Sequence, residues 1–261
     1  MGRENFLPRQ KKMHVYIYDS FVNQKQFDGL LAQIETRLTD LGLNGKISRL
    51  GAMMNIKDTV ANELRRGAKT IIAVGNDQTV NQTVNALVGS SIPLGIIPVG
   101  KKNNSIAANL GIDSDLAACD IISARRIEKL DLGLANNSFF LTKAAITTKG
   151  SIIEIDKSYS IEVMEEGEIN IVNLPTDEKE RLPEVSFNPQ DKKLELYIKT
   201  EAKKNFFKKI LNQSIFTFNR LTIINKKHPL LLDGLTEVTT PAEIRVAEQK
   251  IQVIVGKNRS F

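Results

Sequence analysis

The hydrophobic positions of the chain follow two different periods, one in each half. In the first half, short apolar runs such as residues 14–18 and 71–74 alternate with segments whose apolar residues recur at helical spacing, as over residues 27–41. Alternating strands and helices predict a parallel sheet with helices on both faces. Ligands of such doubly wound α/β domains bind at the carboxyl edge of the sheet.

The second half, from about Gly111 onward, consists mainly of short alternating or β-rich stretches. The expected strands are residues 151–155, 159–164, 168–172, 194–198, 216–224 and 244–255. Such a series favours an antiparallel β-sandwich. We therefore expect a flexible arm over residues 1–12, an α/β nucleotide-binding domain over 13–124 and a β-sandwich substrate-side domain over 125–261.

One stretch of the first half changes abruptly from strand to turn to helix. Residues 71–74 are an apolar run typical of a buried strand, and Gly75 and Asn76 tolerate a positive φ. Thr79, followed by Gln82 three residues later, has the pattern of a capping box. A helix that begins there would offer unpaired N–H donors to an anion, above all to phosphate.

The same stretch carries a resemblance to a known family. Residues 75–79 resemble the Gly-Gly-Asp-Gly-Thr signature of the diacylglycerol kinase and NAD kinase superfamily, and residues 80–85 resemble the Val-Asn-Glu-Val-Val-Asn of its lipid kinase branch. Residues 93–100 are similar to a second lipid kinase block. The Thr-Gly-Asn-Asp that follows this block in the family reads Lys-Lys-Asn-Asn over residues 101–104 here.

The resemblance implies ATP as phosphate donor, Mg²⁺ as metal and a lipid hydroxyl, such as that of diacylglycerol, as acceptor. NAD kinase activity ranks lower, because the second block fits the lipid branch better. Asp131 resembles the aspartate at which these kinases cross into their second domain. The residues that the resemblance assigns to nucleotide binding are Gly75, Asn76, Asp77, Thr79, Gly100, Lys101 and Asn103.

Three aspartates are the candidate catalytic and metal residues. Asp233 resembles the family aspartate assigned as general base, although Leu235 replaces the acid paired with it, and Asp77 is expected at the phosphates. Asp191 matches an aspartate in a loop that binds magnesium in bacterial lipid kinases. Each has a structural alternative: an Asx-type turn for Asp77, a hairpin turn for Asp233 and a solvated turn for Asp191.

Substitutions at motif positions support a competing hypothesis. They are Asn76, Gln78, Gln82, Lys101, Asn104 and Leu235. Since these positions lie where phosphate or metal should approach, a catalytically silent member that binds nucleotide or lipid is the alternative to an active kinase.

Charge and composition limit the classes of partner that we expect for this protein. The net charge of +6 and pI near 9.3 suggest an anionic partner, and the chain contains no nucleic-acid-binding motif. Lysines beside apolar residues over 202–213 predict a cationic helix suited to an anionic membrane surface, or one whose apolar stripe packs on the sandwich. Cys119 is the single cysteine, expected to pack in the core, and no apolar run is long enough to span a bilayer. We therefore expect a cytoplasmic protein, peripheral at the inner membrane face if the lysines bind lipid.

Overall fold

The computed structural model describes residues 13–51, 53–100, 102–156, 159–176, 187–205 and 208–261. The side chains of residues 201–212 are outside the description. The predicted arm at 1–12 and the predicted nucleotide ligand Lys101 also lie outside the described residues.

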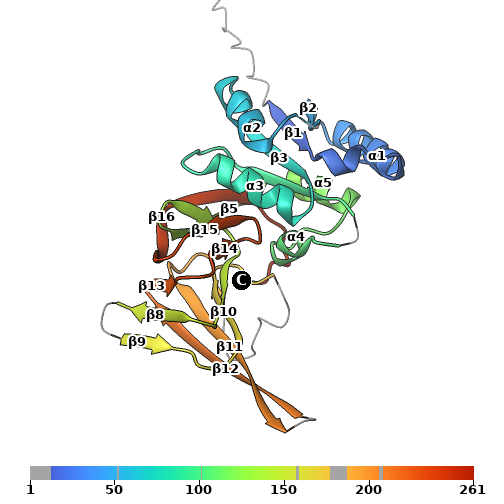
Figure 1. Ribbon diagram of the computed structural model, residues 1–261. Helices are drawn as coiled ribbons and strands as arrows, with labels where there is room; N and C mark the ends of the chain where they lie inside the picture. The colour runs from blue at the N-terminus through green and yellow to red at the C-terminus, as the bar shows by residue number, and fades with distance from the viewer. Residues whose placement is uncertain (1–12, 52, 101, 157–158, 177–186, 206–207) are drawn as a thin grey trace, which may run out of the picture.

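The first half forms the predicted parallel sheet, with strand order β2-β1-β3-β4. Its helices lie in two groups, α1 against α5 and α2 against α3, on the two faces of the sheet (Figure 1). The elements are β1 (His14–Tyr18), the short 3-10 turns η1 (Ser20–Asn23) and η2 (Lys25–Phe27), α1 (Asp28–Asp40), β2 (Gly45–Arg49), α2 (Ile56–Arg65), β3 (Thr70–Gly75), α3 (Asp77–Leu87), β4 (Leu94–Pro98), α4 (Ser105–Asn109) and α5 (Leu116–Ala124).

The second half is built of antiparallel strands in two sheets. One sheet continues the parallel sheet through β16, in the order β4-β16-β13-β8-β9, with β5 beside β16 and β6 beside β5. The other sheet has the order β12-β11-β10-β7-β14-β15. The strands are β5 (Ile127–Ala135), β6 (Ser138–Phe140), β7 (Lys143–Thr147), β8 (Ser151–Ile155), β9 (Tyr159–Glu162), β10 (Gly167–Val172), β11 (Leu194–Asn205), β12 (Lys208–Phe218), β13 (Arg220–Asn225), β14 (Leu230–Leu232), β15 (Thr236–Val238) and β16 (Ala242–Ile254). The predicted fold class is therefore confirmed.

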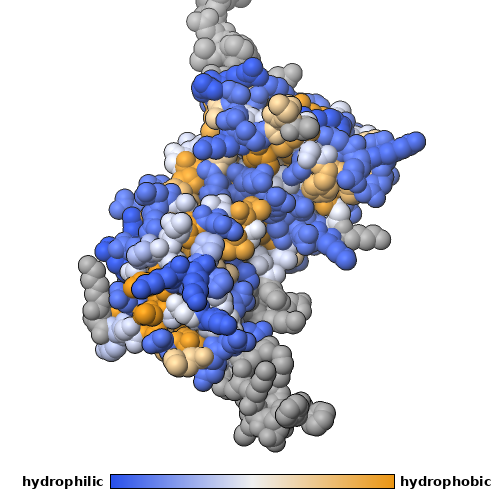
Figure 2. Space-filling view, viewed as in Figure 1, coloured by the Kyte–Doolittle hydropathy of each residue, from blue (hydrophilic) through white to orange (hydrophobic). Residues whose placement is uncertain are grey.

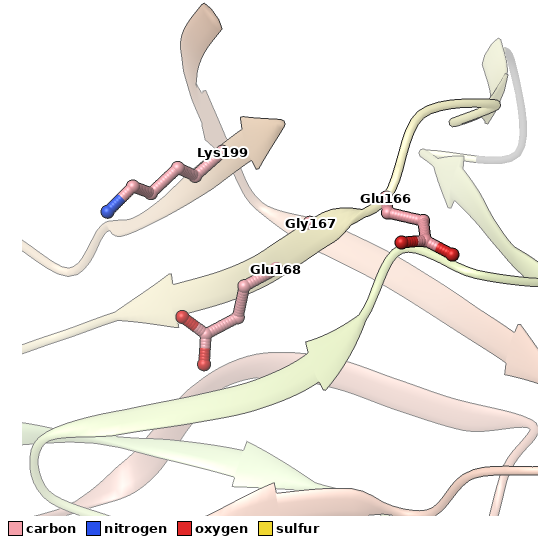
Figure 3. A pocket seen from close by; sticks show the side chains of 4 residues that line it. All are labelled: Glu166, Gly167, Glu168 and Lys199. Atoms are coloured by element: carbon pink, nitrogen blue, oxygen red, sulfur yellow. The ribbon is translucent and has the colours of Figure 1, made fainter. Parts of the chain in front are cut away.

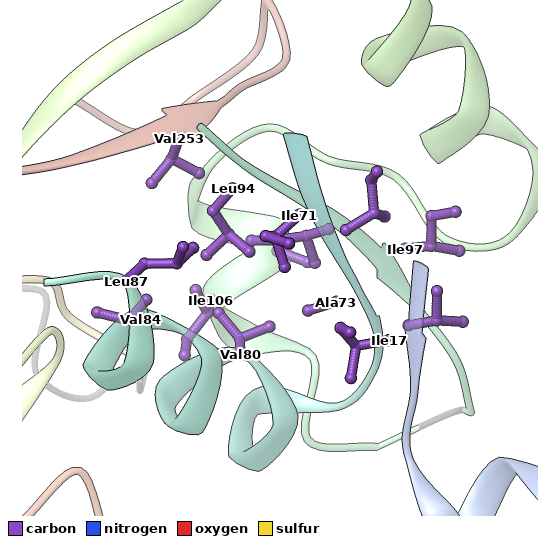
Figure 4. Close-up of a cluster of buried hydrophobic side chains, with 14 of the residues drawn as sticks. Ile17, Ile71, Ala73, Val80, Val84, Leu87, Leu94, Ile97, Ile106 and Val253 are labelled. Atoms are coloured by element: carbon purple, nitrogen blue, oxygen red, sulfur yellow. The ribbon is translucent and has the colours of Figure 1, made fainter. Parts of the chain in front are cut away.

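The molecule has two hydrophobic cores: one around the parallel sheet, to which β5 and β16 also contribute, and one within the sandwich. In the first, α3 packs Val80, Val84 and Leu87 toward the sheet residues Ile71 and Leu94 (Figure 4). This apolar face fixes the position of α3, so its first turn lies at the carboxyl edge of β3. Cys119, on α5, is buried in the same core, as predicted.

The predicted cationic helix over residues 202–213 is wrong. The chain there forms the end of β11 and the start of β12, which pair with each other along residues 194–218 (Figure 1). Lysine and alanine favour helix by a few tenths of a kcal/mol per residue (roughly), which strand pairing in a sheet outweighs. The predicted strand over 216–224 is two strands, β12 and β13, joined at Asn219.

The surface is mostly polar, with an apolar area over β8 and β9 at the far end of the sandwich (Figure 2). Tyr159 and Met164, at the two ends of β9, are among the exposed large hydrophobic residues there. No helix in the described part of the chain is long and apolar enough to cross a bilayer.

Candidate functional site

The N-terminus of α3 is capped by Asn76. Its Oδ1 accepts hydrogen bonds from the Gln78 N–H at 3.0 Å and the Thr79 N–H at 3.2 Å, while Thr79 Oγ1 accepts one from the Asn76 N–H at 3.1 Å. The capping box is thus Asn76 with Thr79, and the predicted pairing of Thr79 with Gln82 is wrong. Asn76 has a φ of −111°, so the expected positive φ is absent there.

Gly75 is required because there is no space for a side chain at this position, and not because of its backbone conformation. A Cβ at this position would lie 2.2 Å from Thr79 Oγ1. Because the Thr79 hydroxyl also donates to Asp19 Oδ2 at 2.7 Å, the absent side chain lets β1, β3 and α3 converge. This link between Asp19 and Thr79 was not foreseen from the sequence.

The first-turn amides of α3 are all paired within the protein. Besides the two that Asn76 accepts, the Asp77 N–H donates to the Asn103 carbonyl at 2.7 Å and the Val80 N–H to the Asn76 carbonyl at 3.0 Å. The expected set of unpaired donors at this helix end is therefore not found. A phosphate would have to displace one of these bonds.

Asp77 connects α3 to α4. Its Oδ2 accepts from the Ser105 N–H at 2.8 Å and its Oδ1 from the Ile106 N–H at 2.9 Å. Burial raises the pKa of Asp77, and these two hydrogen bonds oppose the shift. Instead of closing its own Asx turn, the carboxylate caps the next helix.

The turn before α4 contains two further predicted ligands. Gly100 has a φ of +94° and Asn103 a φ of +61°, both in the left-handed region. Asn104 Nδ2 donates to the Gly100 carbonyl at 2.7 Å, and Asn104 Oδ1 is buried without a hydrogen-bond partner among the described residues. The hydrogen bond from the Asp77 N–H to the Asn103 carbonyl places this turn beside the Gly75–Thr79 turn.

A pocket of about 500 Å³ opens at the carboxyl edge of the parallel sheet. We call it the edge pocket. It is lined by Asp19, Ser20, Phe21, Leu50, Met54, Asn55, Ile56, Asn76, Gln78 and Gln82. These residues come from the segments that follow β1, β2 and β3, which is where a ligand of a doubly wound sheet binds. Of the predicted nucleotide ligands, only Asn76 lines it.

Asp233 lies in the second half, in the turn between β14 and β15. Asp233 and Gly234 both have positive φ, which is the geometry of a tight hairpin. The Asp233 carboxylate accepts hydrogen bonds from the Leu141 N–H at 2.9 Å, the Thr142 N–H at 2.8 Å, Thr142 Oγ1 at 2.6 Å and the Lys143 N–H at 3.2 Å. Burial raises its pKa, and the four hydrogen bonds oppose the shift.

Oδ1 accepts three of these four hydrogen bonds and Oδ2 accepts one, so most of the acceptor capacity of the carboxylate is already used. Through these hydrogen bonds, Asp233 holds the β14–β15 hairpin against the start of β7. No hydrogen bond or ion pair joins it to Asp77 among the described contacts of the two residues. The role of Asp233 as a base remains a prediction.

Asp191 is exposed, and its Oδ1 accepts from the Lys193 N–H at 2.9 Å. The described part of the chain contains no cluster of three or more His, Cys, Asp or Glu side chains arranged for a metal. The hydrogen bond to Lys193 is that of a turn, and the metal role of Asp191 stays a prediction.

Two buried acids, Glu195 and Asp131, lie near the loop that contains Asp191, and neither was predicted as a site residue. Glu195 is buried, and burial, together with the nearby Asp191 carboxylate, raises its pKa to about 7. Asp131 is also buried: Lys250 Nζ lies 2.7 Å from its Oδ1, and the Lys192 N–H donates to its Oδ2 at 2.8 Å. Asp131 thereby ties the loop before β11 to β5.

A second pocket, of about 270 Å³, lies on the sandwich. It is lined by Glu166, Gly167 and Glu168 near β10 and by Lys199 on β11 (Figure 3). None of the predicted site residues contributes to it.

Comparisons with known proteins agree with this architecture. Residues 14–135 match the family model of the diacylglycerol kinase catalytic domain. The chain is 39% identical, over 31% of its length, to the diacylglycerol kinase of Staphylococcus haemolyticus, and 28% identical, over 49% of its length, to that of Bacillus subtilis. The matched segments span 26% and 43% of those two relatives, so the chain spans less than half the length of either.

The fold is similar over nearly its whole length to a solved structure. A crystal structure of a diacylglycerol kinase from Bacillus anthracis superposes with a TM-score of 0.73 at 18% identity, covering 94% of this chain and 97% of that one. The likeness extends through both halves of the molecule.

Proposed function

We propose that this chain, whose residues 14–135 match the diacylglycerol kinase family, binds a nucleotide in the edge pocket without transferring its phosphate at an appreciable rate. The family is one of phosphate-transferring enzymes, for which ATP and usually a divalent metal are implied. The proposal concerns what this chain retains of that activity.

The observation that carries the proposal is that the protein itself occupies the groups that phosphoryl transfer uses. The first-turn amides of α3 are paired, the Asp77 carboxylate caps α4 and the Asp233 carboxylate accepts four hydrogen bonds. Phosphoryl transfer depends on charge stabilisation and on a positioned base, and these hydrogen bonds compete with both roles. We expect such a site to bind a nucleotide and to transfer its phosphate slowly.

The implied ligands fit the described residues unequally. The edge pocket, at about 500 Å³, is within the usual range of roughly 300–1,000 Å³ for ligand sites. For Mg²⁺, the described part of the chain contains no group of three or more His, Cys, Asp or Glu side chains that could hold the ion.

A second candidate is an active ATP-dependent lipid kinase that phosphorylates a lipid hydroxyl, such as that of diacylglycerol, at an anionic membrane surface. Its support is that Gly100 and Asn103 both have positive φ, a backbone conformation that can turn amides toward an anion. Asp77 and Thr79 would then lie near the phosphates and Asp233 would act as base. The relatives from Staphylococcus haemolyticus and Bacillus subtilis, both diacylglycerol kinases, support this candidate.

Two measurements distinguish the candidates. Thermal unfolding with ATP, with and without Mg²⁺, tests binding, because a ligand at a hundred times its Kd adds about 2.7 kcal/mol. ADP release in mixed micelles of diacylglycerol tests transfer. We expect stabilisation by ATP and no lipid-dependent ADP release; absence of stabilisation overturns nucleotide binding.

Lipid-dependent turnover by the wild type would establish the kinase instead. In that case Asp233→Asn should abolish turnover while circular dichroism shows a folded chain. The Asn76→Gly, Gln78→Gly double variant provides the complementary test: activity that appears only in this variant would support the silent wild type.

A further inference from the structure

The edge pocket is poorly suited to phosphate. Asp19 is the only charged side chain among its described lining residues, and it is an anion. No Lys or Arg lines the pocket in the described part of the chain, and the neighbouring amides of α3 are already paired. A polyphosphate normally binds cations or free backbone donors, so nothing here compensates its charge.

The walls of the pocket suit a flat, uncharged ring. Phe21, Leu50, Met54 and Ile56 supply apolar surface on one side. The Phe21 ring makes an edge contact with Phe27 at a centroid distance of 5.8 Å, which holds its orientation. Aromatic and apolar faces of this kind bind nucleobases by stacking, whatever the charge of the attached groups.

Two amide side chains complete the pocket. Gln78 and Gln82 are one turn apart on α3, both exposed and both in the pocket lining, and neither side chain has a hydrogen-bond partner among the described residues. An amide presents a donor and an acceptor side by side, which matches the N6 and N7 edge of adenine. These residues replace a glycine and an acid of the family pattern.

We propose that the edge pocket recognises the adenine nucleoside part of its ligand through Gln78 and Gln82 and that phosphates add no affinity. The inference rests on the proposed nucleotide binding and specifies its chemistry. Phosphates of a bound nucleotide would extend out of the pocket into solvent, where screening makes their charge inconsequential.

The test is isothermal titration of the whole chain with adenosine, AMP, ATP and tripolyphosphate at physiological salt. Adenosine and ATP should bind with Kd values within about threefold of each other, and tripolyphosphate should not compete. ATP binding more than about tenfold tighter than adenosine, or competition by tripolyphosphate, overturns the inference. Binding of ATP alone removes the inference but leaves nucleotide binding intact, whereas binding of neither removes both.

Variants locate the recognition. Gln78→Leu and Gln82→Leu should each weaken adenosine binding about tenfold, the value of one good hydrogen bond to a base edge, without changing the unfolding temperature. The matched control is Gln33→Leu, an exposed glutamine on α1 on the opposite face of the sheet. Equal affinity of all three variants and the wild type would contradict the assignment.

Discussion

Gly75 illustrates how a single residue sets the site. The space that its Cβ would fill is taken by Thr79, whose hydroxyl joins α3 to the end of β1. The glycine is therefore a consequence of close packing and of the hydrogen bond to Asp19.

Gly75→Ala should destabilise the protein by on the order of 1–3 kcal/mol, because the new methyl group must displace Thr79. Urea unfolding measures the loss. Gly29→Ala is the control: nothing lies within 4 Å of its Cβ position in α1, so it should stabilise by about 0.5–1 kcal/mol. A neutral effect at Gly75 would contradict the packing.

Glu195 gives a prediction for the dependence of stability on pH. Its pKa is about 7 when folded, against 4.5 ordinarily, because it is buried and faces Asp191. Between these pH values the folded chain keeps a proton that the unfolded chain has released, so stability falls as pH rises from 4.5 to about 7.

Glu195→Gln should remove that fall and be more stable than the wild type at pH 8, by on the order of 1–3 kcal/mol, with little difference near pH 4.5. Thermal unfolding across this pH range measures it. Glu237→Gln, at an exposed site on β15, should follow the wild type. Parallel pH profiles for wild type and Glu195→Gln would show that burial of this acid has no thermodynamic effect.

At the scale of elements, the candidate site is a junction of two helix ends. Asp77 belongs to the first turn of α3, yet its carboxylate caps α4, a helix of only five residues. So short a helix depends on capping and packing for its stability. The position of the Gly100–Asn103 turn depends on the same carboxylate.

Asp77→Ala should cost about 1–2 kcal/mol, as loss of a helix cap does. Hydrogen exchange should show faster exchange over Ser105–Asn109, with β3 unchanged. Asp40→Ala, exposed at the end of α1, is the control and should change stability by less than about 0.5 kcal/mol. If α4 kept its protection, the cap would be unimportant.

At the scale of the molecule, β16 holds the two halves together. It pairs with β4 of the parallel sheet and with β13 and β5 of the sandwich. On it, Lys250 forms an ion pair with the buried Asp131, whose carboxylate also holds the loop before β11. The ion pair between Lys250 and Asp131 therefore links β16 to β5 and to the loop before β11.

Lys250→Met should destabilise the whole molecule by on the order of 2–4 kcal/mol, because Asp131 would remain as a buried charge without a cation. Adding Asp131→Asn should recover at least half of the loss, as measured by urea unfolding. Lys257→Met, at an exposed position, should have little effect. If the double variant is no more stable than Lys250→Met, the loss of stability comes from the packing of the Lys250 side chain and not from its charge.

The sequence by itself determined the architecture. Apolar periodicity located β1, β3 and the start of α3 to within two residues, and the motif residues indicated the resemblance to diacylglycerol kinases and the sheet edge at which a ligand is expected. These features are local: each depends on a few neighbouring residues and on burial of one face.

Only the tertiary structure decided what the motif residues do. Asp77 and Asp233 have their hydrogen-bond partners 28 and 92 residues away in the chain, and Asp19 reaches Thr79 across 60 residues, separations that no local pattern records. The segment at 202–213 is a strand pair because β10 and β12 lie beside β11, although its composition favours helix. Whether a carboxylate is free or engaged is set by which donors the fold brings to it from distant parts of the chain.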